Sequence, residues 1–519
     1  MKFLEILIKT LNALEEKISR IPFVYSVIAF LFYVSLRMYL ETYSDNIQVS
    51  LNQLRFFYPF YIDMFLHNFS SIVCVALIFI IIFRLATKKK VKSVAQIIFL
   101  FFFIVILPPI IDLIISSGKG LNITYLFPET HKDLLHRFLT FGGDYKMIGV
   151  TPGMRIEVAI ALFLSFLYFY ISTSKLLRSI FYVFLIYFSL FLVVITPFFL
   201  KLIFSLFHLV TLYYNRILFH YYLLIILFEC ILLAYLANKD RFRLIIKDMR
   251  PFRTGHALVM LMLGVVIGLK GGHFVLSANN FFHFLLIPVS IIFACLAAIL
   301  VNNVEDYEID KISNKERPLA AGLIDFDSYK KLIFPFLAAA FLYSAAVSSK
   351  ALFIILLCIL NYLLYSVSPI RLKRIPVLSK IVISFNSLFV IMLGFIVVNG
   401  SLMRFPQVLY PVILIGFTLA ANFIDIKDYE GDKKVGLKTL PTIFGLKKSK
   451  LIIGSFFVIA YLLMYFLLDE IAALPALIVL GALQFCLVNR ENYDERPIFV
   501  VHLLSISMLI FYVFMFGKF

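Results

Sequence analysis

A long apolar run ends in the stretch Asn302-Asn303-Val304-Glu305-Asp306-Tyr307-Glu308-Ile309-Asp310. Asn302, Asp306 and Asp310 are spaced four residues apart, so a continuing helix would line them along one face. Like charges at this spacing repel each other, so a helix that stacks them needs a compensating cation. The stretch therefore predicts an apolar helix whose end carries a cation-binding face.

A second acidic stretch ends another apolar run, four predicted helices later. It reads Asn422-Phe423-Ile424-Asp425-Ile426-Lys427-Asp428-Tyr429-Glu430-Gly431-Asp432. Asp425, Asp428 and Asp432 fall three and four residues apart, again on one helical face. The matching places of the two stretches indicate an internal repeat with one carboxylate cluster in each half. The alternative is a pair of solvated helix ends with ordinary acidic residues.

Two facing carboxylate clusters suit Mg²⁺, which takes one or two carboxylates and completes its shell with water and phosphate oxygens. Bound metal turns a diphosphate into a good leaving group by neutralising charge on the departing oxygen. We therefore expect one set of side chains to hold Mg²⁺ and a diphosphate. That set is Asn302, Asp306, Asp310, Asp425, Asp428 and Asp432.

The composition places the rest of the chain in a membrane. Of 519 residues, 62% are hydrophobic and only 15% are charged, whereas a soluble domain is about half apolar and a quarter charged. The apolar runs have the length of helices, not of barrel strands, so we predict an all-α polytopic membrane protein. The net charge of +18 fits basic loops on the cytoplasmic side and gives no reason to expect a nucleic-acid partner.

Apolar runs of about twenty residues mark the expected membrane spans. Six lie in the first half, near residues 22–40, 60–83, 96–116, 152–171, 178–200 and 218–237. Nine lie in the second half, near 255–270, 283–302, 332–348, 350–367, 378–399, 407–424, 451–468, 471–488 and 497–516. With the N-terminus in the cytoplasm, nearly every basic cluster falls on the cytoplasmic side, together with both acidic stretches. The basic stretch 238–253 separates a predicted accessory domain of unknown function, 1–238, from a catalytic domain, 239–519.

Basic residues follow the first acidic stretch and the fourth helix of the second half. Arg317 follows the first stretch, and Arg371 and Lys373 lie beyond Tyr365. Guanidinium groups match phosphate oxygens in pairs and Lys acts as a point charge, so these residues are candidates for binding the diphosphate. The alternative is that they only anchor the loops at the membrane surface.

These stretches together resemble the UbiA family of intramembrane prenyltransferases over about residues 240–519. Asn302-x-x-x-Asp306-x-x-x-Asp310 followed by Arg317-Pro318-Leu319 is similar to the first motif of that family. The second motif is matched by Asp425-x-x-Asp428-x-x-x-Asp432, then Gly436 and Thr439-Leu440-Pro441, and the segment between the motifs by Tyr365-Ser366 and Arg371-Leu372-Lys373-Arg374. The family usually has Asp where this chain has Asn303, a position off the acidic face.

The resemblance implies nine helices around a central cavity that opens to lipid, with the two Asp motifs capping it on the cytoplasmic side. It implies Mg²⁺-dependent transfer of an isoprenyl group from a prenyl diphosphate to a lipophilic acceptor, and a location in the cytoplasmic membrane. The catalytic residues implied are Asp306, Asp310, Asp425, Asp428 and Asp432. The substrate-binding residues implied are Asn302, Arg317, Tyr365, Arg371 and Lys373.

Several alternatives stay open at this point. The acceptor expected first is an aromatic quinone precursor or another lipid. The alternatives are a glycerol-phosphate lipid and, in a related branch, transfer of phosphoribose to a polyprenyl phosphate. An ion-coupled transporter and an inactive assembly subunit are alternatives of another class. Asp112 and Glu229, which lie within apolar runs, and His256, in the first helix of the second half, are open between functional and structural roles.

Overall fold

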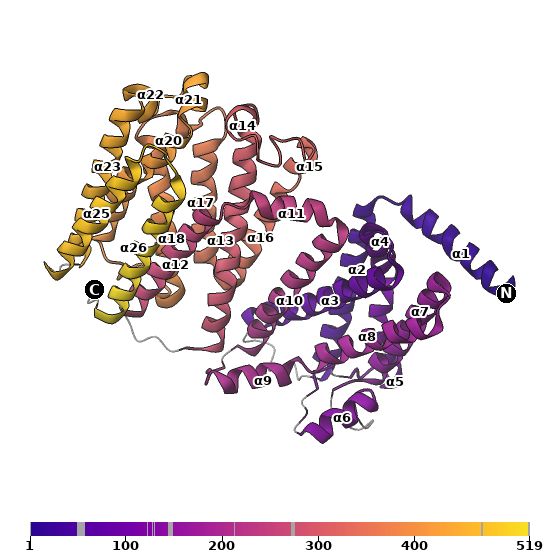
Figure 1. Cartoon of the computed structure of the whole chain (residues 1–519). Helices are drawn as coiled ribbons and strands as arrows, with labels where there is room; N and C mark the ends of the chain where they lie inside the picture. The colour runs from indigo at the N-terminus through magenta and orange to yellow at the C-terminus, as the bar shows by residue number, and fades with distance from the viewer. Residues whose placement is uncertain are drawn as a thin grey trace. The chain divides into compact units, whose positions relative to one another are not determined.

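The computed structural model describes residues 2–48, 58–121, 123–126, 128, 130–143, 149–211, 213–270, 276–468 and 471–516. Within these ranges every regular element is helical, and one isolated bridge joins Val210 to Ser277 (Figure 1). Fourteen helices in the described ranges are long and apolar enough to cross a membrane. The chain is therefore an all-α, integral, multi-pass membrane protein, as the composition predicted.

The described chain forms two compact units. Unit 1 comprises Met1–Lys239 together with Ser277–Asn279, and unit 2 comprises Asp240–Leu276 together with Asn280–Phe519. The roles assigned to the two parts of the sequence, one accessory and one catalytic, stay predictions at this level.

Unit 1 contains every span predicted in the first half. The predicted span near 178–200 is two helices, because Thr196 and Pro197 begin a new helix after Val194 and proline has no N–H with which to continue the previous one. The elements are α1 (Lys2–Ser19), α2 (Phe23–Gln48), α3 (Tyr58–Thr87), α4 (Val91–Phe101), η1 (Phe102–Ile106), α5 (Leu107–Ile115), α6 (His131–Leu139), α7 (Pro152–Thr173), α8 (Leu176–Val194), α9 (Thr196–Leu206) and α10 (Tyr214–Ala237).

Unit 2 holds most or all of each later helix. These are α11 (Lys239–Asp248), α12 (Pro251–Lys270), α13 (Ala278–Glu305), α14 (Tyr307–Ser313), α15 (Phe326–Lys330), α16 (Ile333–Val347), α17 (Ser349–Ser366), η2 (Leu372–Arg374), α18 (Leu378–Asn399), α19 (Leu409–Ala420), η3 (Ala421–Phe423), α20 (Ile424–Lys427), α21 (Tyr429–Val435), α22 (Leu440–Phe444), α23 (Leu446–Leu463), α24 (Tyr465–Leu468), η4 (Ile471–Ala473), α25 (Leu474–Val488) and α26 (Glu495–Phe516).

One predicted span differs from the fourteen long apolar helices. The span predicted near 451–468 is built as α23 followed by the short α24. Lys447, Lys448 and Lys450 lie in the first turns of α23, so its length and composition together do not make it a membrane-spanning candidate. The division of unit 2 into nine spans therefore stays a prediction.

Helices α12 and α18 pack backbone against backbone. A Cβ atom on Gly264 would lie 2.0 Å from the carbonyl oxygen of Ile391, and one on Gly394 would lie 2.2 Å from that of Leu261. Only glycine permits this approach, which is typical of tight helix pairs in membranes. The contact fixes α12 relative to α18, and both helices carry basic residues at their N-terminal ends.

Candidate active site

Both acidic stretches contain the same break in a helix. Asp306 separates α13 from α14 with φ −98° and ψ 10°, and Asp428 separates α20 from α21 with φ −87° and ψ 4°. A helical hydrogen bond nevertheless runs forward from the carbonyl of each of these aspartates. The N–H of Asp310 donates to the carbonyl of Asp306 at 2.8 Å, and that of Asp432 to the carbonyl of Asp428 at 2.9 Å. The acidic residues therefore stay on one line past each break.

The two breaks lie at the same end of unit 2. The short helices that follow them, α14 and α21, contact each other, and both lie near the top of Figure 1. The clusters also influence each other electrostatically, because Asp428 feels the positive charge of Arg317 and Asp432 feels that of Lys373. The structure thus brings the two predicted carboxylate clusters together.

Every aspartate of the first cluster has a basic partner. Asp306 accepts hydrogen bonds from Arg371 at 2.5 Å and from Lys373 at 2.5 and 2.6 Å. Asp310 forms an ion pair with Arg317 and accepts a hydrogen bond from Asn314 at 3.0 Å. Burial raises the pKa of the Asp310 carboxyl, and the charge of Arg317 opposes that rise. In motif one, Asn302 to Asp310, three basic side chains of the chain itself therefore pair with two aspartates.

The second cluster is balanced only in part. Lys380 on α18 donates to Asp425 at 2.5 Å, whereas Asp428 and Asp432 make no ion pair with any residue in the described ranges. Burial raises the pKa of Asp432 to about 7, with further contributions from the negative charges of Asp425 and Asp428. Burial likewise raises the pKa of Asp428, against the charge of Arg253. Motif two, Asp425 to Asp432, therefore contains two aspartates, Asp428 and Asp432, without an ion-pair partner in the described structure.

The carboxylates alone do not form a complete metal cage. Among the residues described, no three His, Cys, Asp or Glu side chains come together in a group that could hold a metal ion. A Mg²⁺ ion at motif two would therefore need oxygen ligands from outside the chain, which is the usual state of Mg²⁺ bound with a phosphate.

Unpaired donors lie on the basic side of the site. The Nε–H of Arg371 is buried and has no hydrogen-bond partner within the described chain. Arg253, at the start of α12, makes no ion pair there either. Burial lowers the pKa of the nearby Arg250 to about 10, and the positive charges of Arg253 and Arg317 lower it further. This concentration of guanidinium groups favours an anion with several oxygens.

Asn303, the departure from the family pattern, faces away from the acidic line. Its side chain is 1% exposed. It accepts a hydrogen bond from Arg250 at 2.7 Å, and its amide donates to Tyr329 at 2.8 Å and to both oxygens of Asp248 at 3.2 Å. Tyr329 also donates to Asp248. Asn303 therefore holds α11, α13 and α15 together and positions Arg250.

The remaining predicted residues lie on the same end of unit 2. The hydroxyl of Ser366, the last residue of α17, donates to the Asn302 side chain at 3.2 Å. The neighbouring Tyr365 is partly buried, with its ring centre 5.9 Å from that of Tyr362. The fold thus gathers every candidate site residue. Sequence reasoning missed Lys380 and Arg253, although a lone lysine inside a predicted span is a recognisable signal.

His256 belongs to a chain of hydrogen bonds inside unit 2. Its Nε2 lies 2.9 Å from Ser387 Oγ, and its Nδ1 lies 3.1 Å from His502 Nε2. The ring of Phe417 packs edge-on against both imidazoles, at 5.4 and 5.6 Å between ring centres. This arrangement joins α12, α18 and α26 one helical turn beyond Arg253.

Asp112 and Glu229 have structural partners in unit 1. Asp112 is fully buried and accepts a hydrogen bond at 2.8 Å from the N–H of Gly153, in the first turn of α7, so it satisfies a free donor at that helix end. Glu229 accepts a hydrogen bond from the Cys74 thiol at 3.2 Å.

A family model and several known proteins match part of this chain. Residues 257–510 match the family model described as the UbiA prenyltransferase family. The digeranylgeranylglyceryl phosphate synthase of Methanoculleus marisnigri is 29% identical over 176 residues, which cover 32% of this chain and 60% of that protein. The protein of the same name from Thermococcus gammatolerans is 30% identical over 210 residues, covering 38% of this chain and 72% of that protein.

Solved structures were also found to be similar to this chain. A UbiA homologue from Archaeoglobus fulgidus bound to GPP and Mg²⁺ is 21% identical, with a TM-score of 0.41 over 53% of this chain and 100% of that one. The chain belongs to the UbiA prenyltransferase family. The predicted enzyme class, a prenyltransferase embedded in the membrane, is thereby confirmed.

Proposed function

We propose that unit 2 transfers an isoprenyl group from a prenyl diphosphate to a hydroxyl of a glycerol-phosphate lipid, with Mg²⁺ held at the two acidic breaks. The observation that carries the proposal is the contact between α14 and α21. It joins a cluster whose basic residues can bind phosphate oxygens to a cluster in which Asp428 and Asp432 have no ion-pair partner in the described structure.

The side chains present fit both the metal and the diphosphate. The unpaired carboxylates of Asp428 and Asp432 supply hard oxygen ligands. The unpaired Nε–H of Arg371 and the guanidinium of Arg253 supply donors for phosphate oxygens. When bound, Mg²⁺ neutralises charge that develops on the leaving oxygen.

The ion pairs of motif one hold its basic side chains in position. Asp306 holds Arg371 and Lys373 together, and Asp310 holds Arg317. Because these bases are ordered before the substrate arrives, little reorganisation is needed to bind the diphosphate. Asn302, held by Ser366, would add an amide to the same end of the site.

The reaction breaks the bond between the allylic carbon C1 and a diphosphate oxygen, and the electron pair leaves with the diphosphate. The acceptor oxygen then forms a new bond to C1, and its hydroxyl proton passes to an oxygen of the departing diphosphate. Arg371, Lys373 and Arg317 stabilise the departing anion. The allylic cation is stabilised by aromatic faces such as that of Tyr365, and the apolar surroundings keep water from capturing it.

The names of the relatives support the proposed acceptor class. Both synthases described above are named for a glyceryl phosphate that carries two geranylgeranyl groups. A glycerol-phosphate lipid is therefore the acceptor we propose first. We also propose that the protein lies in the cytoplasmic membrane with both acidic breaks on the cytoplasmic side, where a charged diphosphate is available.

The test uses the full chain in lipid nanodiscs with radiolabelled geranylgeranyl diphosphate, geranylgeranylglyceryl phosphate and Mg²⁺. We expect a labelled ether lipid in Mg²⁺ and none in EDTA. If the label appears on an added aromatic quinone precursor and not on the glycerol lipid, the proposed acceptor is wrong and the proposed donor site stands. Absence of transfer to either acceptor, with the donor intact, would overturn the proposal.

A further inference from the structure

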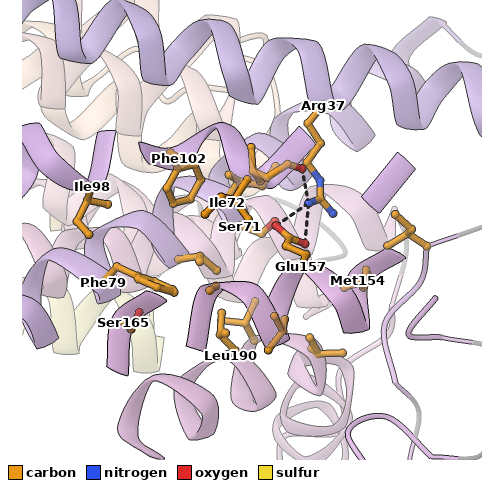
Figure 2. Close-up of a pocket in the computed structure, with 18 of the residues that line it drawn as sticks. Arg37, Ser71, Ile72, Phe79, Ile98, Phe102, Met154, Glu157, Ser165 and Leu190 are labelled. Carbon is orange, nitrogen blue, oxygen red and sulfur yellow. Dashed lines mark hydrogen bonds and ion pairs between the residues drawn. The ribbon is translucent and has the colours of Figure 1, made fainter. Parts of the chain in front are cut away.

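Unit 1 contains a large cavity that the transferase site does not use. Its volume is about 770 Å³, within the range of about 300–1,000 Å³ that is typical of ligand pockets. All of its lining residues belong to unit 1. Figure 2 shows Phe79, Ile98 and Phe102 along one side of it.

Most of the wall is hydrocarbon. Side chains from α3, α4, α7 and α8 contribute aliphatic and aromatic groups, of which Ile72, Phe79, Ile98 and Leu190 are examples. An empty space of this size would forfeit the dispersion contacts of every atom that lines it. In a membrane protein the available filling for such a space is a hydrocarbon chain.

One end of the cavity carries charge. Arg37 on α2 donates from Nε to Glu41 at 2.7 Å and from Nη1 to Glu157 on α7 at 3.2 Å, and Figure 2 shows the latter pair. Arg37 also donates to the carbonyl of Val105 at 2.9 Å. That carbonyl lacks a helical partner because the residue four places later, Pro109, has no N–H. The chain therefore fixes Arg37 firmly in place.

The charged end is short of positive charge. Two carboxylates, Glu41 and Glu157, share the single guanidinium of Arg37, and all three side chains are at most 16% exposed. Glu15, which also lines the cavity, has its own partner in Lys89 at 2.5 Å. A buried carboxylate that shares its cation needs a further proton donor. A phosphate head group would add negative charge where it is already in excess.

Polar atoms without partners lie in the same wall. His67 Nδ1 and Thr124 Oγ1 are buried and have no hydrogen-bond partner in the part of the chain that the structure describes. His67 is 5% exposed. Both atoms can bond a hydroxyl group, and burying them without a partner is costly.

We propose that this cavity binds a long-chain amphiphile whose head group is a hydrogen-bond donor without negative charge, that is, a lipid alcohol or a lipid amine. The chain would lie among Phe79, Ile98 and Leu190, and the head would donate to Glu157 or Glu41. Every residue that forms this site lies in unit 1, and none of the predicted transferase residues lines it.

The test is photolabelling of the full-length protein in nanodiscs. The probe is hexadecanol with a diazirine in its chain, and the matched probe is the corresponding hexadecyl phosphate. We expect the alcohol to label peptides of α3 and α7 saturably, in competition with unlabelled hexadecanol, at a concentration about tenfold or more below that of the phosphate, because like charges in a dry site repel strongly.

Variants separate the cavity from general lipid contact. Ala161→Phe and Ser165→Phe place a ring in the cavity and should each abolish saturable labelling. Ala234→Phe, on the exposed side of α10, is the control and should leave it unchanged. Glu157→Gln keeps the shape of the side chain and removes its charge. It should therefore reduce the difference between the concentrations at which the alcohol and the phosphate probes label the protein. Equal labelling by both probes, or labelling that the two cavity-filling variants leave intact, would overturn the proposal.

Discussion

At Asp306 and at Asp428 the chain makes nearly the same turn, but the two acidic clusters differ in their charge balance. In motif one, Asp306 and Asp310 are both paired with Arg or Lys side chains. In motif two, Lys380 pairs with Asp425, and Asp428 and Asp432 have no ion-pair partner in the described structure. The same backbone turn therefore occurs in two clusters whose carboxylates differ in whether they have basic partners.

The difference indicates which motif would contact the phosphate oxygens and which would contact Mg²⁺. Motif one holds basic side chains in fixed positions, and those bases suit the phosphate oxygens. Motif two presents carboxylates that lack a cation, and those suit Mg²⁺. The predictions below test this division, in the order of their expected effect on the rate of prenyl transfer.

The largest effect is expected from Asp428→Asn. It removes an unpaired carboxylate from the metal side, so kcat/KM should fall by about 10²–10³-fold, the usual scale for losing one stabilising group at a developing charge. Radiolabel transfer at saturating Mg²⁺ measures the effect. The control is Glu430→Gln, an exposed acid on α21, which should change the rate less than about twofold. Equal losses of kcat/KM in both variants would mean that the overall negative charge of this region matters, and not the position of the Asp428 carboxylate.

A smaller loss is expected from Arg371→Lys. The substitution keeps the charge and the ion pair with Asp306 but removes the guanidinium fork and its unpaired Nε–H. The KM for prenyl diphosphate should rise by about 10–100-fold, the scale of one or two charge-assisted hydrogen bonds. Arg374→Lys, at an exposed neighbouring position, serves as the control. An unchanged KM in Arg371→Lys would show that the guanidinium group of Arg371 does not bind the diphosphate.

Lys380→Met tests whether the pair with Asp425 is mainly structural. The substitution leaves a buried carboxylate without a partner, which should lower the free energy of unfolding by about 3 kcal/mol. It should also lower the rate in the folded fraction by about tenfold, as expected for a group that supports a metal ligand. Tm in detergent and transfer per folded protein are the two readouts. Pairing it with Asp425→Leu should recover stability but not transfer, and recovery of both would refute a role for Asp425 at the metal.

The smallest effect on the rate is expected from Asn303→Asp, which gives motif one the residue usual in the family. The new carboxylate would lose the donor to Tyr329 and to Asp248, and would place negative charge beside Asp248. Stability should fall by about 1–3 kcal/mol, whereas the Mg²⁺ concentration for half-maximal rate should change less than about twofold. A large shift in that concentration would show that this position contacts the metal.

Much of the fold could be predicted from local sequence. Apolar runs bounded by charge mark the spans because each helix must satisfy its own backbone in lipid. The spacing of Asn302, Asp306 and Asp310 predicted a line of side chains, and the hydrogen bonds across the break preserve that line. The division after Val194 and the lysine-rich start of α23 were harder, because proline and charge act there against continuous apolar patterns.

The pairing within the site could not be predicted. Which base meets which acid depends on contacts between residues far apart in the chain, such as Lys380 with Asp425 and Arg371 with Asp306. The place of Arg253 depends on the packing of α12 against α18 through Gly264 and Gly394, which joins residues far apart in the chain. The sequence put an aromatic or other lipid acceptor first and a glycerol-phosphate lipid second, since the acidic motifs report on the donor and not on the acceptor.

The central claim is that both breaks grip one metal diphosphate, and its most direct test is a binding measurement without turnover. Isothermal titration would follow a non-reactive thiolo analogue of geranylgeranyl diphosphate binding to the full chain in Mg²⁺ and in EDTA. We predict affinity about a hundredfold weaker in EDTA, with Asp428→Asn losing most of the Mg²⁺ effect. Tight binding that neither EDTA nor Asp428→Asn alters would contradict the claim.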